Sequence, residues 1–151
     1  IVAGADLIGI GDAASSLIGP RFYDRLVFPR TQRLVSEIHR RGALVRLHVC
    51  GRTRKLLPWM GKVGADIVDL DWMVPLDEAR RECGLTQVLL GNIDPVSVLR
   101  NGTPETIQQA LARCLEHAGP RYIVGAGCEV VRDTPDENVR AMIAFARSHK
   151  P

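Results

Sequence analysis

The chain has 151 residues, the length of one ordinary domain, and 46% of them are hydrophobic while 25% are charged. A net charge of only +3, without a strong basic cluster, argues against nucleic acid or an anionic membrane as the main partner, and no apolar run is long enough for a membrane helix. Four cysteines in a chain of this length do not indicate a disulfide framework, so we expect a reducing, cytoplasmic compartment.

Short apolar runs alternate with amphipathic stretches along the chain. Each run has the length of a strand and is rich in Ile, Val and Leu, which is typical of parallel strands covered on both faces. The predicted strands are 5–10, 43–48, 65–70, 87–90 and 122–124.

Helical patterns fill the intervals, and we expect helices over 31–41, 53–62, 103–117 and 134–150. Thr103-Pro104 and Thr134-Pro135 are start signals, because each pairs an N-cap residue with a Pro suited to the first helical position. The side chains expected to face the core are Leu34, Val35, Ile38, Leu56, Leu57, Met60, Ile107, Ala110, Leu111, Cys114, Val139, Met142, Ile143 and Ala146.

Strand and helix alternate about five times, which indicates an α/β fold with a parallel sheet. An open doubly wound sheet and part of an eight-stranded barrel both fit this pattern. The chain starts at Ile1, directly in an apolar pattern, so we expect a single domain over 1–151 cut from a longer protein. Polar residues placed just after each strand also favour the barrel, because there they converge on one mouth. They are Asp12, His48, Cys50, Asp71, Asn92, Asp94, Cys128 and Glu129.

Three of these residues form a candidate metal site. His48 and Cys50 are two apart in a strand pattern and share a face, and Cys128 follows the last predicted strand. One imidazole and two thiolates suit tetrahedral zinc, and three protein ligands leave one position open, as in catalytic sites. The alternative is that these residues are ordinary packing residues, since a lone Cys is often a small buried hydrophobe.

Five linked motifs cover almost the whole chain, and together they resemble the uroporphyrinogen decarboxylase superfamily. Within it, the chain is most similar to the zinc-dependent corrinoid methyltransferases. The motifs are Leu47-His-Val-Cys-Gly51, Gly64-Ala-Asp-Ile-Val-Asp-Leu-Asp71, Gly91-Asn-Ile-Asp-Pro95, Gly127-Cys-Glu129 and Thr134-Pro-Asp-Glu-Asn138. The resemblance implies a partial TIM (β/α)8 barrel, made of about five C-terminal β/α units with parallel strands.

The resemblance also implies a reaction. It is methyl transfer from a corrinoid (methylcobalamin, free or on a corrinoid protein) to a small-molecule thiol, with zinc held by His48, Cys50 and Cys128. The decarboxylases of this superfamily usually carry a His where this chain has Cys128, although Trp72 is similar to their pattern. The alternatives are a uroporphyrinogen decarboxylase of porphyrin biosynthesis and a non-catalytic corrinoid- or partner-binding module.

The remaining polar residues receive candidate roles. Glu129 and Asp71 are the catalytic candidates, Glu129 as a group near the metal or a replaceable ligand and Asp71 as the residue that orients a ligand. Asp12, Asn92 and Asp94 are candidates for substrate binding, with helix or loop capping as the alternative for the two aspartates. Two open sheet edges are expected, to be covered by a homo-oligomer or by a missing N-terminal part of the barrel.

Overall fold

The computed structural model describes residues 1–149 and contains one sheet whose five strands are all parallel. The strands lie side by side in their order along the chain, whereas a doubly wound sheet reverses its strand order at a switch point. All five predicted strands are therefore confirmed, in the order that a barrel requires. Their bounds are β1 (Leu7–Asp12), β2 (Leu44–Val49), β3 (Ile67–Leu70), β4 (Val88–Ile93) and β5 (Tyr122–Ala126).

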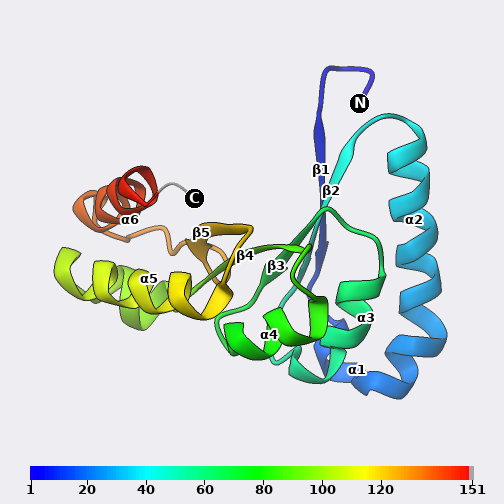
Figure 1. Ribbon diagram of the computed structural model, residues 1–151, viewed down its shortest axis with the longest axis horizontal. Coiled ribbons are helices and arrows are strands. Elements are labelled where there is room, and N and C mark those ends of the chain that lie inside the picture. Colours follow the sequence, from blue (N-terminus) through cyan, green and yellow to red (C-terminus); the bar gives the residue numbers. More distant parts are fainter. Residues whose placement is uncertain (150–151) are drawn as a thin grey trace.

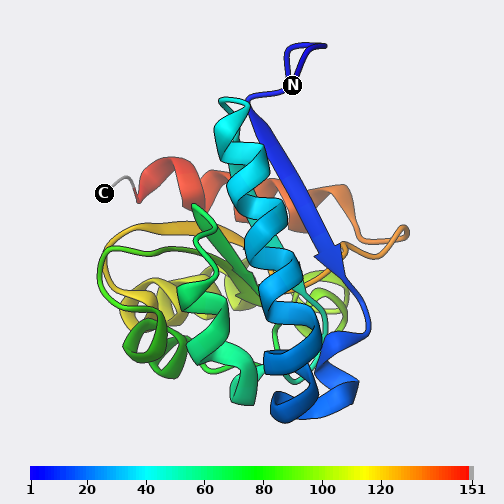
Figure 2. The same ribbon diagram turned by 90° about the vertical axis from the view of Figure 1, so that its right-hand side faces the viewer.

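Helices connect the strands and lie on one side of the sheet. Figure 1 shows α2, α3, α4 and α5 following one another around this side, and in Figure 2 helix α2 stands in front of the sheet, antiparallel to β1. None of the helices within residues 1–149 is both long and apolar enough to cross a membrane. The helices are α1 (Ser15–Phe22), α2 (Phe28–Arg40), α3 (Leu57–Lys62), α4 (Leu76–Cys83), α5 (Pro104–Ala118) and α6 (Asp136–Ser148), with short helical turns at Tyr23–Val27, Arg54–Leu56 and Pro95–Arg100.

The core lies between the sheet and the helices. In β2, Val45, Leu47 and Val49 are buried on the helix side, while the residues between them, including Arg46 and His48, lie on the opposite face. The expectation that both faces would be covered is wrong for the described residues. Apolar side chains on the helix-free face are exposed, because five strands only partly enclose a barrel interior. They include Leu7, Leu44 and Ile123.

The predicted start of α5 is confirmed in detail. The Thr103 hydroxyl accepts a hydrogen bond from the backbone N–H of Thr106, and the Thr106 hydroxyl accepts one from the backbone N–H of Thr103. This reciprocal capping satisfies two donors that the first helical turn would otherwise leave free. The predicted inward residues of this helix, and those of the stretch 53–62, also lie in the core.

The predicted inward faces of two other helices need correction. Leu34 is 48% exposed, so α2 buries only Val35 and Ile38 of its three predicted residues. Helix α6 begins after Pro135, which occupies the N-cap position instead of the first helical turn. Its buried stripe is Asn138, Ala141 and Phe145, with Met142 partly buried, while Ile143 and Ala146 are exposed.

The rotation of α6 has a polar cause. The side-chain amide of Asn138 donates to the backbone oxygens of Leu99 and Gly102, at 2.8 and 3.0 Å. Because this amide is buried, leaving it without acceptors would cost about 1–3 kcal/mol. The hydrogen bonds therefore hold the Asn138 side of the helix inward, and an apolar periodicity alone does not reveal this constraint.

A carboxylate between α2, β2 and β3 should make stability depend on pH. Asp66 accepts hydrogen bonds from the backbone N–H of Val45 (2.7 Å) and from His39 Nε2 (2.8 Å). Burial opposes the shift, but these hydrogen bonds lower the pKa of Asp66 below its ordinary value. A lowered pKa means that the stabilisation is present above the unfolded-state pKa of about 3.9 and is lost as the pH falls through the folded-state pKa.

We therefore expect Asp66→Asn to reduce the free energy of unfolding at pH 7 by about 1 kcal/mol, since the site is partly exposed. Urea unfolding of both proteins between pH 7 and pH 3 measures this difference. The difference should shrink below about pH 4, where the wild-type carboxylate becomes protonated. A difference that stays constant over this range would contradict the assignment.

Candidate metal centre

His48, Cys50 and Cys128 meet at the carboxyl ends of the strands. His48 is the next-to-last residue of β2, Cys50 follows that strand directly, and Cys128 lies just beyond β5. One ligand atom from each residue lies within 4.8 Å of the others, and His48 Nε2 is 3.8 Å from Cys128 Sγ. All three side chains are partly buried, and none of the four cysteines forms a disulfide. The predicted constellation is therefore brought together although 80 residues separate His48 from Cys128.

Two glycines permit this approach. Gly51 turns the chain after Cys50 with a φ of 88°, a conformation that other residues adopt only with strain. A Cβ on Gly127 would lie 2.3 Å from the backbone nitrogen of Trp72, so only glycine allows the loop before Cys128 to pass this close. The backbone N–H of Gly127 also donates to the Ile93 carbonyl at 2.9 Å. Backbone packing thus sets the position of Cys128.

Asp71 joins the loops that follow β2 and β3. Its buried carboxylate accepts hydrogen bonds from the backbone N–H of Gly51, at 2.7 Å, and from that of Met73, at 3.0 Å. Because Gly51 is adjacent to Cys50, the hydrogen bond from Gly51 to Asp71 holds in place the loop that carries Cys50. The catalytic role of Asp71 stays a prediction.

Sequence reasoning missed a charged pair behind His48. His48 Nδ1 lies 3.2 Å from the backbone oxygen of Asp69 and 3.5 Å from its carboxylate, which also pairs with Arg46 Nε at 3.0 Å. An acceptor at Nδ1 keeps the proton on that nitrogen and leaves Nε2 free to bind a metal ion. The signal was available in the sequence, since Arg46 and Asp69 each interrupt an apolar strand run.

Electrostatics at the site couple proton binding to metal binding. Hydrogen bonding to Asp69 raises the pKa of His48 to about 9, against the opposing effect of burial, and Cys128 adds to the rise. Burial raises the pKa of Cys50, and the neighbouring Cys128 raises it further. Protons on His48 and Cys50 would therefore compete with a metal ion at this site, and binding of an ion would release them.

The three candidate ligands line an open cavity of about 460 Å³ on the helix-free side of the sheet. Glu129, Val130, Leu90 and Ala126 line the same cavity, together with Arg46 and Asp69. Glu129 is exposed, so its carboxylate is free to approach a group bound near the cysteines. The structure thus places Glu129 beside the ligands, and its catalytic role stays a prediction.

The three residues proposed for substrate binding all make internal hydrogen bonds. The Asp12 carboxylate caps the start of α1 through the backbone N–H of Ser15, and Asp94 caps the following helical turn through the backbone N–H groups of Val96 and Ser97. The amide of Asn92 is buried and donates to the backbone oxygens of Asp71 and Val74. These contacts give each residue a structural role at the strand ends, and substrate binding stays a prediction.

Replacing the carboxylate behind His48 should weaken metal binding without abolishing it. In Asp69→Asn the negative charge near His48 Nδ1 is lost, while the backbone carbonyl of Asp69 remains as an acceptor. We expect metal affinity to fall by about tenfold, the lower end of the range for residues that orient a ligand. A zinc titration against a competing chelator measures the change. Asp77→Asn, at an exposed position, serves as the control, and equal affinity in both variants would contradict this role.

Sequential parallel strands, helices on one side and polar groups at the carboxyl ends of the strands define part of a β/α barrel with a candidate active-site mouth. The family model of uroporphyrinogen decarboxylase (URO-D) matches residues 1–149, and the chain belongs to this family. A solved methyltransferase from Methanosarcina mazei superposes on 97% of this chain with a TM-score of 0.86 and 25% identity. The superposition covers 43% of that protein, so the chain corresponds to part of its barrel.

Curated relatives include two kinds of enzyme. The methylcobamide:CoM methyltransferase MtbA of Methanosarcina mazei is 34% identical over 149 residues, which are 97% of this chain and 43% of that protein. The methylated-thiol–coenzyme M methyltransferase of the same organism is 35% identical over 93% of this chain and 37% of its own length. The uroporphyrinogen decarboxylase of Microcystis aeruginosa is 33% identical over 97% of this chain and 42% of that enzyme. The chain thus spans less than half the length of these relatives.

Proposed function

We propose that this chain holds zinc through His48, Cys50 and Cys128 and that the protein transfers a methyl group from a corrinoid to a thiol. The observation that carries the proposal is the convergence of these three ligand atoms within 4.8 Å at the mouth of a barrel. The two methyltransferase relatives, whose names include a cobamide and coenzyme M or a methylated thiol and coenzyme M, support this type of reaction.

The side chains of His48, Cys50 and Cys128 suit zinc in their chemical type, and the distance between two of their ligand atoms suits it as well. Zinc favours thiolate and imidazole ligands, with bonds of about 2.3 Å to sulfur and about 2.0–2.1 Å to nitrogen. Tetrahedral geometry at these bond lengths separates a sulfur from a nitrogen ligand by about 3.5 Å. The separation of 3.8 Å between Cys128 Sγ and His48 Nε2 is close to this value, so small side-chain movements suffice for binding.

The chain's own residues would hold and orient the reacting group. When bound, zinc supplies the Lewis acidity that keeps a substrate thiol deprotonated at neutral pH. His48 presents Nε2 while Asp69 accepts at Nδ1, and Asp71 fixes the loop that carries Cys50. The open cavity in front of the ligands offers room for the thiol and for an approaching methyl donor. No activated Ser or Cys of the protein is required, since the nucleophile comes from the substrate.

The test is methyl transfer by the full-length protein supplied with zinc, methylcobalamin and coenzyme M. We expect a methylated thiol product, lost after removal of the metal and in Cys128→Ser. Cys114→Ala is the matched control, because Cys114 packs between helix and sheet away from the three ligands. Transfer that survives loss of Cys128 and of the metal would contradict the proposal. Metal-free decarboxylation of a tetrapyrrole carboxylate by the same protein would replace it with the decarboxylase function.

A further inference from the structure

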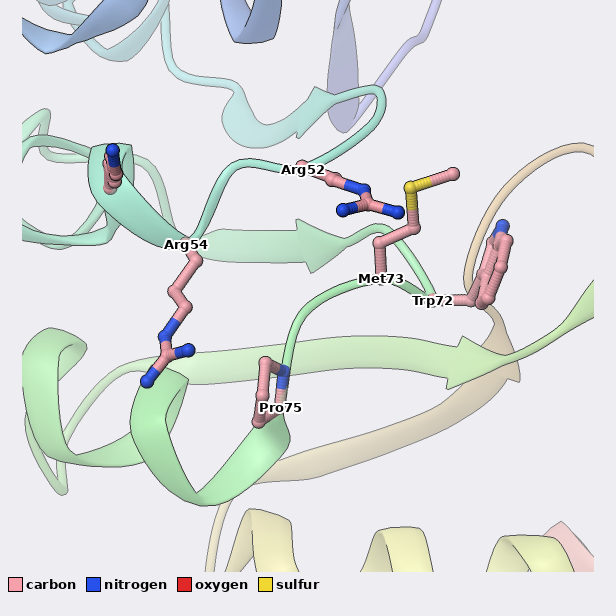
Figure 3. A pocket seen from close by; sticks show the side chains of 6 residues that line it. Arg52, Arg54, Trp72, Met73 and Pro75 are labelled. Carbon is pink, nitrogen blue, oxygen red and sulfur yellow. The ribbon is translucent and has the colours of Figure 1, made fainter.

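A second cavity, of about 590 Å³, shares no lining residue with the cavity at the candidate metal centre. Its walls are the loops after β2 and after β3, the same loops that Asp71 connects. Figure 3 shows the Arg52 guanidinium extending toward Met73, Trp72 at one end of the space, and Arg54 pointing toward the start of α4 near Pro75. The lining residues are Arg52, Arg54, Lys55, Trp72, Met73 and Pro75.

The cavity is positively charged. Three of its six lining residues are cations, and none carries a carboxylate. Arg54 forms an ion pair with Glu78, which neutralises one of the three charges. Arg52 and Lys55 have no ion pair within residues 1–149. Two positive charges thus remain available to an anion, and a guanidinium can bind an oxyanion through two parallel hydrogen bonds.

The cavity also presents an apolar surface. Trp72 is 42% exposed and Met73 is 39% exposed, although both follow directly after the buried strand end and Asp71. A large aromatic side chain left in water beside cations is more informative than a single exposed leucine, because Trp and Arg are typical of binding sites. A flat ring can stack on the indole while its charged substituent reaches the cations.

Backbone hydrogen bonds hold both walls in place. The Thr53 N–H donates to the Gly51 carbonyl at 2.8 Å, which fixes the turn that carries Arg52. Opposite, the Val74 N–H donates to the Asp71 carbonyl at 3.0 Å, and the backbone of Trp72 packs against Gly127. A ligand would therefore order few backbone groups on binding, which lowers the entropic cost.

We propose that this cavity binds an organic anion in which a phosphate, sulfonate or carboxylate group is joined to a flat ring. Arg52 and Lys55 bind the anionic group, and Trp72 stacks on the ring. The site is separate from the three metal ligands and does not rest on the methyl-transfer function. Both halves of the ligand are required, since the cations recognise only the charge and the indole only the ring.

Phenyl phosphate carries both halves and is the first probe. In a nitrogen–proton correlation spectrum, the indole N–H resonances of Trp59 and Trp72 report on two separate sites of this chain. Trp59 donates to Asp24 at 2.6 Å and packs edge-on against Tyr23, so it serves as an internal reference. We expect phenyl phosphate to shift the Trp72 resonance saturably and to leave the Trp59 resonance in place. Inorganic phosphate and benzyl alcohol should each bind at least about tenfold more weakly.

Charge variants test the role of the cations. Arg52→Gln and Lys55→Gln should each weaken phenyl phosphate binding by about tenfold, and added salt should weaken binding to the wild type. Arg113→Gln is the matched control, because Arg113 is exposed on α5 and does not line the cavity. The proposal is overturned if benzyl alcohol binds as tightly as phenyl phosphate. Equal affinity in Arg52→Gln and Arg113→Gln would also overturn it.

Discussion

Replacing Cys128 with Ser is expected to weaken zinc binding by about a hundredfold or more, because a thiolate ligand is exchanged for a poorly ionised hydroxyl. The effect should be large because only three protein ligands converge at this site within the described residues. Cys50→Ser should have an effect of similar size, since its sulfur is part of the same group. Loss of either sulfur leaves two ligands, too few to hold zinc against competition from water or a chelator.

Zinc content after dialysis against a competing chelator measures this effect independently of any activity. The wild type should retain about one zinc per chain, as one group of three ligands requires. Cys114→Ala should retain the same amount of zinc, because Cys114 lies on α5 and packs against the apolar core. Full retention of zinc by Cys128→Ser would remove the basis of the metal site.

Replacing Arg80 with Met is expected to lower the free energy of unfolding by about 3–5 kcal/mol, the range for breaking a buried charged network. Arg80 is 7% exposed and has no carboxylate partner within residues 1–149. Its guanidinium instead donates to five backbone carbonyls, as many acceptors as it has N–H groups. The acceptors belong to Gly84, Gln87, Ala118, Pro120 and Arg121.

These contacts explain the size of the expected loss. Arg80 joins the end of α4 to the loop before β4 and to the connection between α5 and β5, segments up to 41 residues apart. A methionine fills a similar volume but removes these five hydrogen bonds, at a cost of about 1–3 kcal/mol for each carbonyl that is left dry and without another donor. The Arg121 carbonyl keeps one donor, the backbone N–H of Leu89. Water reaching some of the other carbonyls would keep the total near the stated range.

Urea unfolding followed by circular dichroism measures this loss. Arg81→Met is the matched control, because Arg81 is the next residue of the same helix and is exposed. Its free energy of unfolding should stay within about 0.5 kcal/mol of the wild type. Similar stabilities of the two variants would show that the Arg80 hydrogen bonds contribute little.

Much of the architecture could be predicted from local patterns. Short apolar runs rich in Ile, Val and Leu predicted all five strands, and Thr103-Pro104 predicted the start of α5, because these signals depend only on neighbouring residues. The alternation of residues in a strand also predicted that His48 and Cys50 share one side. Placing Cys128 near these two residues required the additional assumption that the strands belong to a barrel, in which the strand ends converge on one mouth.

Other features could not be predicted because their partners are remote in sequence. Arg80 lies outside the four helices predicted from the sequence, and nothing in the neighbouring residues indicated that five carbonyls surround it. Helix α6 was rotated away from its expected face by the hydrogen bonds of Asn138. The cavity between Arg52 and Trp72 likewise depends on two separate loops that one carboxylate holds together.

The amino-acid sequence by itself determined the order of the strands, the N-cap of α5 and the residue types available for metal chemistry, because periodicity and side-chain chemistry are local properties. Only the tertiary structure decided which face of α6 is buried, which carbonyls Arg80 binds and how closely Cys128 approaches His48. The physical reason is that strand ends that lie far apart in the chain become neighbours when parallel strands pair. The distances between side chains at the carboxyl ends of the strands therefore depend on how the whole chain packs.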